Sequence, residues 1–222
     1  MSIEQKRKVM FRFSLRFWIL NGNIRGERRA VNKPENRAGW VLTGGRSSRM
    51  GTDKALISLD GRPLALRVAD AVAGFCGVVS LVGDPARYAA LGLPVIPDTF
   101  PGQGPLAGIE AALGATAADW NLVVACDMPA LGSGIVGRLF ESDGDCVLPQ
   151  YEDGRVEPLC AVYHRRCHTG IRAALEAGVR KVTDALRRLE SDGFAIRYLR
   201  VENEAPFANL NTPDEMQRYL NG

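Results

Sequence analysis

The sequence predicts an α/β fold in which a doubly wound, mostly parallel sheet is covered by helices on both faces. Short and almost continuously apolar segments alternate along the chain with amphipathic segments of helical period. Strands that are buried on both faces have this apolar character, and right-handed crossovers between parallel strands place helices on both sides of the sheet. These two observations favour a single three-layer α/β/α domain, which a chain of 222 residues can form.

The same pattern gives the order of the elements from residue 38 onward. Expected strands span residues 39–43, 78–82, 95–97, 120–126, 145–149, 156–163 and 195–200. Expected helices span residues 63–77, 85–91, 105–115, 133–141, 165–177 and 182–189, and a last helix opens at Thr212 and Pro213. The polar turn at residues 152–155 predicts a hairpin, so we expect the sheet to become mixed there.

Charge is distributed unevenly along the chain, and this limits the classes of function. Residues 1–37 hold ten Lys or Arg and three Glu, a formal charge of +7, so residues 38–222 carry −4 of the net +3. A mildly acidic folded body lacks the clustered basic surface that nucleic-acid binding requires. The composition therefore favours small-molecule chemistry and argues against nucleic acid as a partner.

Residues 1–37 are expected to be a basic extension that is disordered or that results from a start codon upstream of the true one. A segment lying on a membrane surface is the alternative, because aromatic residues alternate with Arg between Phe11 and Trp18. The apolar run is too short and too charged for stable membrane insertion. Five cysteines scattered through apolar segments are typical of reduced thiols, so we expect a cytoplasmic protein.

A glycine-rich loop follows the first expected strand. Its polyphosphate-binding candidates are Leu42, Thr43, Gly44, Gly45, Arg46, Arg49 and Lys54. Paired glycines let a backbone approach phosphates, and basic side chains neutralise their charge. The loop lacks the Gly-Lys-Ser/Thr ending of a Walker A loop and the Gly-x-Gly-x-x-Gly pattern of dinucleotide-binding proteins, which excludes both classes. We interpret it as a phosphate cradle in preference to a surface turn with solvated arginines.

Two further loops follow expected strands, and open α/β sheets bind ligands at the carboxyl ends of their strands. Asp98 follows the third strand, and Gly104 precedes a helix whose first N–H groups can receive an anion or a base edge. Asp127 comes directly after the strand at residues 120–126. One such carboxylate can hold Mg²⁺ when phosphates and waters complete the octahedron. The structural alternative for Asp127 is an Asx-turn or a helix N-cap.

The remaining reactive residue types do not suggest a site. Cys126 has no neighbouring His that could activate it, so we interpret it as a packed strand thiol. Cys160, His164, Cys167 and His168 lack the paired spacing of a zinc site, and we interpret the two histidines as part of a solvated helix face. With only two histidines, both in this region, no Ser-His-Asp arrangement is indicated.

The ordered set of loops resembles the molybdenum cofactor guanylyltransferase family of nucleotidyltransferases over residues 39–222. The matching segments are residues 42–54, 104–109, 126–129, 157–158 and 209–214. The resemblance implies a Rossmann-like nucleotidyltransferase domain at residues 38–222 that transfers GMP from GTP to molybdenum-molybdopterin. Pyrophosphate would be released, Mg²⁺ would be the cofactor, and molybdenum-insertion and molybdoenzyme maturation proteins would be further partners.

The resemblance also implies roles for individual residues. The implied nucleotide-binding residues are Leu42, Thr43, Gly44, Gly45, Lys54, Asp98, Gly104 and Asp127. Lys54, Arg49 and Asp127 are the implied catalytic residues, with Asp127 as the metal ligand, and Asn209 and Asn211 lie near the pterin. Thr43 stands where the family usually has Ala, and residues 80–83 lack an Asn that some members use for nucleotide binding.

Three other activities stay open at this point. The chain could be a molybdopterin cytidylyltransferase using CTP, a transferase acting on a sugar phosphate or phospholactate, or a non-catalytic nucleotide-binding maturation factor. The Gly-Pro-Leu-Ala-Gly segment at residues 104–108 favours guanine, and the retained basic residues together with Asp127 argue against a non-catalytic binder.

Overall fold

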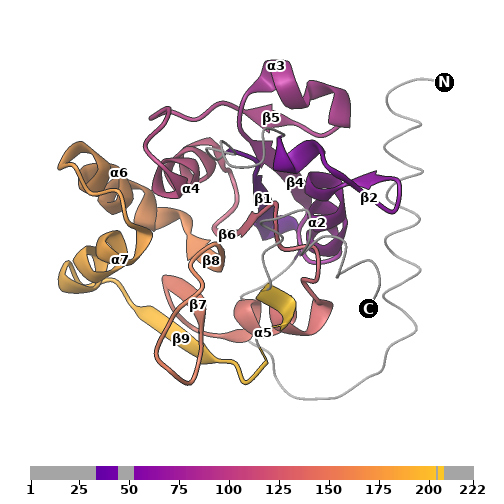
Figure 1. The fold of residues 1–222 in the computed structure, drawn as a ribbon. Coiled ribbons are helices and arrows are strands. Elements are labelled where there is room, and N and C mark those ends of the chain that lie inside the picture. Colours follow the sequence, from indigo (N-terminus) through magenta and orange to yellow (C-terminus); the bar gives the residue numbers. More distant parts are fainter. Residues whose placement is uncertain (1–33, 45–52, 204, 208–222) are drawn as a thin grey trace. The chain divides into compact units, whose positions relative to one another are not determined.

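The computed structural model describes residues 34–44, 53–203 and 205–207. Within these ranges one seven-stranded sheet has the order β5-β4-β1-β6-β8-β7-β9 (Figure 1). Its strands are β1 (Arg37–Leu42), β4 (Val78–Val82), β5 (Val95–Ile96), β6 (Trp120–Ala125), β7 (Cys146–Gln150), β8 (Cys160–His164) and β9 (Ile196–Arg200). The predicted extension at residues 1–37, except for its last four residues, and the helix expected at Thr212 lie outside the described residues.

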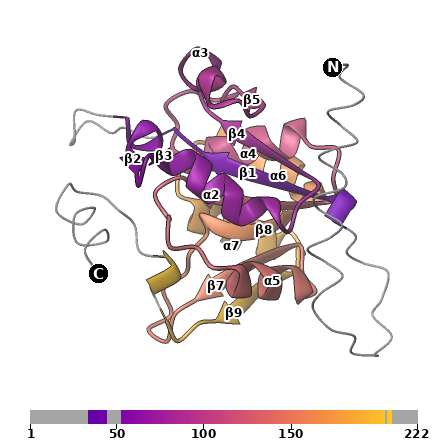
Figure 2. The same cartoon turned by 90° about the vertical axis from the view of Figure 1, so that its right-hand side faces the viewer.

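Helices cover both faces of this sheet (Figure 2). The α-helices are α2 (Leu64–Ala73), α3 (Pro85–Tyr88), α4 (Pro105–Ala115), α5 (Ser133–Glu141), α6 (His168–Glu176) and α7 (Val182–Ser191). Short 3-10 helices are η1 (Pro34–Asn36), η2 (Lys54–Leu56), η3 (Ala89–Leu91), η4 (Arg165–Cys167) and η5 (Ala205–Phe207). One core cluster contains residues of α4, α6 and α7, and the other contains residues of α2 and α5. The predicted three-layer α/β/α architecture is confirmed.

The first strand shows why the two cores form. Trp40 and Leu42 belong to the core under α4, whereas Val41 belongs to the core under α2, because successive strand side chains point to opposite faces. Gly39 lets α2 approach closely, since a Cβ there would lie 2.3 Å from Val72 Cγ1. The buried indole of Trp40 donates to Asn121 Oδ1 at 2.9 Å, which satisfies the one polar atom of that ring.

The sheet is mixed, as expected, and the antiparallel strand is β8. It pairs antiparallel with β6 on one side and with β7 on the other, while β1 is parallel to β4 and β6. The strand expected at residues 156–163 is shorter, beginning at Cys160. Pro158 has no N–H for a ladder, and only an isolated bridge joins Val156 to Gln150.

Other parts of the chain also differ from the prediction. Pro63 is the N-cap of α2 and closes a small hairpin of β2 (Ser58–Leu59) and β3 (Arg62–Pro63) that was not predicted. Asp60 and Gly61 both have positive φ, which matches the Asp-Gly signal of a two-residue hairpin. The helix expected at residues 165–177 is divided into η4 and α6.

Among the described residues, no helix is both long and apolar enough to cross a membrane.

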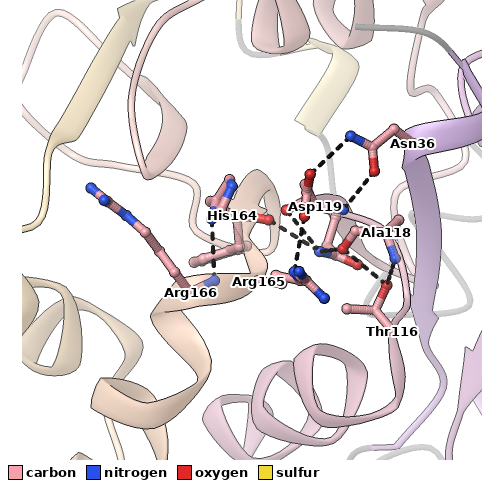
Figure 3. Close-up of polar contacts among 9 residues, drawn as sticks. Asn36, Thr116, Ala118, Asp119, His164, Arg165 and Arg166 are labelled. Carbon is pink, nitrogen blue, oxygen red and sulfur yellow. Dashed lines mark hydrogen bonds and ion pairs between the residues drawn. The ribbon is translucent and has the colours of Figure 1, made fainter. Parts of the chain in front are cut away.

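A polar cluster lies at the amino ends of the parallel strands, where it joins η1 to the residue that precedes β6 (Figure 3). Asn36 Nδ2 donates to Asp119 Oδ2 at 3.0 Å, and Asp119 N donates to Asn36 Oδ1 at 3.0 Å. Arg165 Nε lies 2.9 Å from Asp119 Oδ1. Asp119 thereby connects η1, the start of β6 and the end of β8.

We predict that Asp119→Ala lowers the free energy of unfolding by about 1 kcal/mol at pH 7, because it removes two side-chain contacts of a half-exposed carboxylate. The hydrogen bond from Asn36 holds the pKa of Asp119 below its ordinary value. The stabilisation is therefore present above the unfolded-state pKa of about 3.9 and is lost as pH falls through the lower folded-state pKa.

Urea unfolding of both proteins at pH 7 and pH 3 measures this difference, which should be smaller at pH 3. Asp192→Ala is the control, because the exposed side chain of Asp192 makes no hydrogen bond or ion pair with another described residue. A difference that is the same at both pH values would contradict the role of the Asp119 carboxylate.

Candidate active site

Four loops meet where the parallel strands β1, β4, β5 and β6 end. Backbone bonds align the first residues beyond the strands: Thr43 N donates to Val82 O at 3.0 Å, and Cys126 N donates to Leu42 O at 3.1 Å. The predicted residues Thr43, Asp98 and Asp127 all follow strands of this set. Their loops therefore share one edge of the sheet.

The side chain of Thr43 is bonded to the neighbouring strand β4. The hydroxyl donates to Val82 O at 2.8 Å and is buried against β4. A Cβ at the neighbouring Gly83 would lie 2.2 Å from Thr43 Oγ1 and 2.8 Å from Tyr88 Cε2, so glycine is required there. The exchange of the family's usual Ala for Thr thus adds a bond to β4 without placing a hydroxyl toward a ligand.

The buried Tyr88 joins the two ends of the glycine-rich loop. Its hydroxyl lies 2.7 Å from Asp53 Oδ2 and 3.2 Å from Thr43 O. The hydroxyl shares its single proton between these two acceptors and makes the stronger bond to the nearer one, the Asp53 carboxylate. Burial and the Asp53 carboxylate raise the pKa of Tyr88, so the hydroxyl stays protonated. Tyr88 was not predicted from the sequence, since nothing local to a short helix identifies partners 35 and 45 residues away.

Lys54 and Asp127 come together at the centre of the edge. Lys54 Nζ lies 3.5 Å from Asp127 Oδ2, and both side chains are largely buried at 19% and 22% exposure. Lys54 opens η2, which Asp53 caps by accepting from Ala55 N at 3.1 Å. The structure therefore unites two of the three predicted catalytic residues. Gly45 and the third, Arg49, lie outside the described residues, as do Asn209 and Asn211.

Glu157 lies near Asp127, in the segment that precedes the antiparallel strand β8. The β6–β8 register pairs Val124 with Cys160, and Ala125 N donates to Leu159 O at 2.8 Å, which carries Glu157 toward Asp127. Burial raises the pKa of Glu157; the hydrogen bond from Leu159 N lowers it, and the charge of Asp127 adds a smaller increase. The family resemblance included Glu157 but gave it no role, and its proximity to Asp127 follows from tertiary structure.

Asp98 and the start of α4 form the far side of the site. Asp98 Oδ1 accepts from Phe100 N at 3.4 Å, and burial raises the pKa of Asp98. Gly104 is the N-cap of α4 with φ of 82°, a conformation that favours glycine, and no side chain among the described residues caps the helix. Pro105 has no N–H and Ala107 N donates to Gly104 O at 3.1 Å, so Leu106 N–H is the donor of the first three residues that can receive an anion or a base edge.

The cysteines and histidines form no site in the described part of the chain. Cys126 is buried, and desolvation raises its pKa to about 12, which confirms a packed thiol. No group of three or more His, Cys, Asp or Glu side chains there could hold a metal ion. The solvated helix face expected for the histidines was wrong. His164 ends β8 with its ring edge-on to Trp120, and half-buried His168 bonds to Glu110.

Comparison with known proteins agrees with this arrangement. The family model for the MobA-like NTP transferase domain matches residues 39–191. The molybdenum cofactor guanylyltransferase of Cereibacter sphaeroides is 36% identical over 191 residues, covering 81% of this chain and 93% of the relative. That of Rhodopseudomonas palustris (strain BisB5) is 38% identical over 194 residues, covering 79% of this chain and 89% of the relative.

A solved structure is also similar. Molybdopterin-guanine dinucleotide biosynthesis protein A from Archaeoglobus fulgidus superposes with a TM-score of 0.69 and 27% identity, covering 83% of this chain and 97% of that chain. The family match spans more than half of the sequence and includes the strands and loops that form the site. This chain therefore belongs to the MobA-like NTP transferase family.

Proposed function

We propose that this protein transfers GMP from GTP to molybdenum-molybdopterin, forming molybdopterin guanine dinucleotide and releasing pyrophosphate. The main supporting observation is the Lys54–Asp127 pair, which lies between the end of the glycine-rich loop and the carboxyl end of β6. The names of the full-length relatives support the choice of both substrates.

In this reaction a phosphate oxygen of the pterin attacks the α-phosphorus of GTP. A new P–O bond forms to the acceptor, the bond between the α-phosphorus and the bridging oxygen breaks, and pyrophosphate leaves with the electron pair. Such transfer depends on positioning and charge neutralisation, and it needs no side-chain nucleophile. Lys54 and Arg49 offset the charge that develops on pyrophosphate, while the backbone amides of Gly44 and Gly45 hold the triphosphate.

The residues present fit Mg²⁺ as the cofactor. Asp127 supplies two carboxylate oxygens beside the phosphate cradle, and Lys54 Nζ lies 3.5 Å from one of them, Oδ2. Mg²⁺ prefers oxygen ligands and needs only one or two from the protein. When bound by Asp127, the ion neutralises charge on the phosphates around the bond that breaks.

Further assignments follow from the family resemblance. Asp98 and the amino end of α4 at Gly104 bind the nucleoside part of GTP, and Asn209 and Asn211 contribute to the pterin side. Molybdenum-insertion and molybdoenzyme maturation proteins are the expected partners, acting with this protein in the cytoplasm.

The test of this function is to incubate the protein with molybdopterin, Mg²⁺ and either GTP or CTP, and to determine the mass of the oxidised pterin product. A GMP adduct supports the proposal. A CMP adduct would retain the mechanism and change the nucleotide. If neither nucleotide gives an adduct but GTP binds tightly, the protein is a non-catalytic nucleotide-binding maturation factor and not an enzyme.

We predict that Asp127→Asn lowers kcat by about a hundredfold to a thousandfold without changing the fold, because an amide neutralises the ligand charge while keeping its shape. Steady-state kinetics at saturating Mg²⁺ and circular dichroism measure the two effects. Asp70→Asn is the matched control, since Asp70 pairs with Arg62 on the exposed side of α2. An Asp127→Asn variant with near-normal kcat would exclude the metal role.

Tyr88→Phe should raise the KM for GTP by about threefold to tenfold while kcat changes less than about twofold, because one hydrogen bond to a charged group is lost. The change removes the hydroxyl that joins Thr43 to Asp53 at the ends of the phosphate cradle. Initial rates over a range of GTP concentrations measure it, with the exposed Tyr198→Phe as the control. An unchanged KM would mean that the cradle does not depend on this hydroxyl.

A further inference from the structure

Helix α4 carries a buried carboxylate behind the nucleotide side of the site. Glu110 is only 1% exposed, and its Oε1 contacts His168 Nε2 at 3.0 Å and Arg172 Nη1 at 3.1 Å, both from α6. Among the described residues its Oε2 has no hydrogen-bond partner. Helices α4 and α6 pack together on one face of the sheet (Figure 1). A buried carboxylate needs a compensating charge, and Arg172 supplies it.

Arg172 also reaches past Glu110 to the loop that precedes α4. Its Nε lies 3.1 Å from Glu176 Oε1, and its Cζ lies 5.5 Å from the centre of the Phe100 ring. A planar guanidinium can hold carboxylates along its edge and face an aromatic ring at the same time. Arg172 therefore connects α4 and α6 with the segment at residues 97–104.

Phe100 is the central residue of that segment. Its ring packs partly buried against the core under α4 and α6. Its N–H donates to Asp98 Oδ1 at 3.4 Å, and its carbonyl accepts from Gln103 N at 3.2 Å. Phe100 thus links the Asp98 side chain and the turn before Gly104 to the core on which its ring packs. The charge of Glu110 also contributes to the raised pKa of Asp98, which places the two carboxylates within electrostatic reach.

We propose that Arg172 is a positioning residue for the nucleotide: its bridge from Glu110 to Phe100 holds residues 97–104 where Asp98 and the amino end of α4 receive GTP. This inference rests on the proposed function. Arg172 lies outside all the segments that match the family motifs. Because Lys54 and Asp127 belong to other loops, the bridge affects nucleotide binding and leaves the transfer step unchanged.

The test compares Arg172→Met with the unchanged protein. Methionine keeps an apolar stem but loses both carboxylate contacts and the contact with Phe100, while His168 Nε2 stays 3.0 Å from Glu110 Oε1. Because the change leaves the buried Glu110 without its arginine, circular dichroism and a thermal melt first establish that the variant is folded. The KM for GTP and the Kd for GTP from calorimetry should both rise by about tenfold. The kcat should change less than about twofold, and the KM for the pterin should not change.

Arg172→Lys separates charge from geometry. A lysine keeps the positive charge near Glu110 but lacks the planar group that contacts two carboxylates and an aromatic ring together. We expect it to restore only part of the affinity, leaving the KM for GTP raised by about threefold. Full restoration by lysine would overturn the bridge to Phe100 and leave a purely electrostatic role.

A double substitution tests the path through Phe100. Phe100→Leu should raise the KM for GTP as Arg172→Met does, and the two together should raise it no further, because residues that act as one unit are not additive. Multiplicative effects, an unchanged KM, or a fall in kcat with unchanged KM would each overturn the proposal.

Arg187→Met is the matched control. Arg187 is a highly exposed arginine of α7 that pairs with Asp184 one turn away, and its loss should leave GTP binding unchanged. The proposed function and the positioning role of Arg172 are contradicted by different results. If the unchanged protein forms no GMP adduct, the proposed function is wrong, and GTP calorimetry still measures the bridge. If it forms the adduct but Arg172→Met binds GTP normally, the positioning role is wrong.

Discussion

The parallel pairing of β1 with β4 on one side and β6 on the other is the constraint on which the rest of the site depends. It brings three loops to one edge, and the bonds from Thr43 N to Val82 O and from Cys126 N to Leu42 O continue the alignment one residue past the strands. Loops that are far apart in sequence consequently begin side by side. Lys54 and Asp127 can then meet although 73 positions separate them in the chain.

This arrangement suits a reaction that needs charge to be placed in advance and no covalent participation by the protein. The cation and the carboxylate lie in a largely buried setting, where electrostatic interactions are stronger than in water. The amino end of α4 adds backbone donors on the Asp98 side. The buried thiol of Cys126, beside these groups but with a raised pKa, takes no part in this chemistry.

A second layer of contacts determines how firmly each loop is held. Tyr88 joins the two ends of the glycine-rich loop, and Arg172 connects the loop of Asp98 to α4 and α6. Tyr88 comes from α3, which follows β4, and Arg172 comes from α6, which follows β8 and η4. Small changes in their packing can therefore alter substrate binding without touching the reacting groups.

The sequence by itself determined the fold class and most of the elements, because strand and helix periodicity, Pro and Gly are local signals. Helices α4 and α5 span the predicted residues, and Asp98, Lys54 and Asp127 could be selected as candidates because each stands next to a strand or a glycine-rich turn. The hairpin at Asp60 and Gly61 was not predicted, although the Asp-Gly pair is a local signal for a two-residue turn. The predicted start of β8 was too early because Val156, on the amino-terminal side of Pro158, was included in the apolar run.

Tertiary structure alone decided which distant side chains meet. The insertion of β8 between β6 and β7 brings Glu157 toward Asp127, and the packing of α6 on α4 gives Glu110 its arginine and histidine partners. No periodic pattern specifies such pairs, since a charged residue on a helix looks the same whether it is solvated or buried against a partner. Only the packing of elements dozens of residues apart selects the partner, and that packing depends on the whole core.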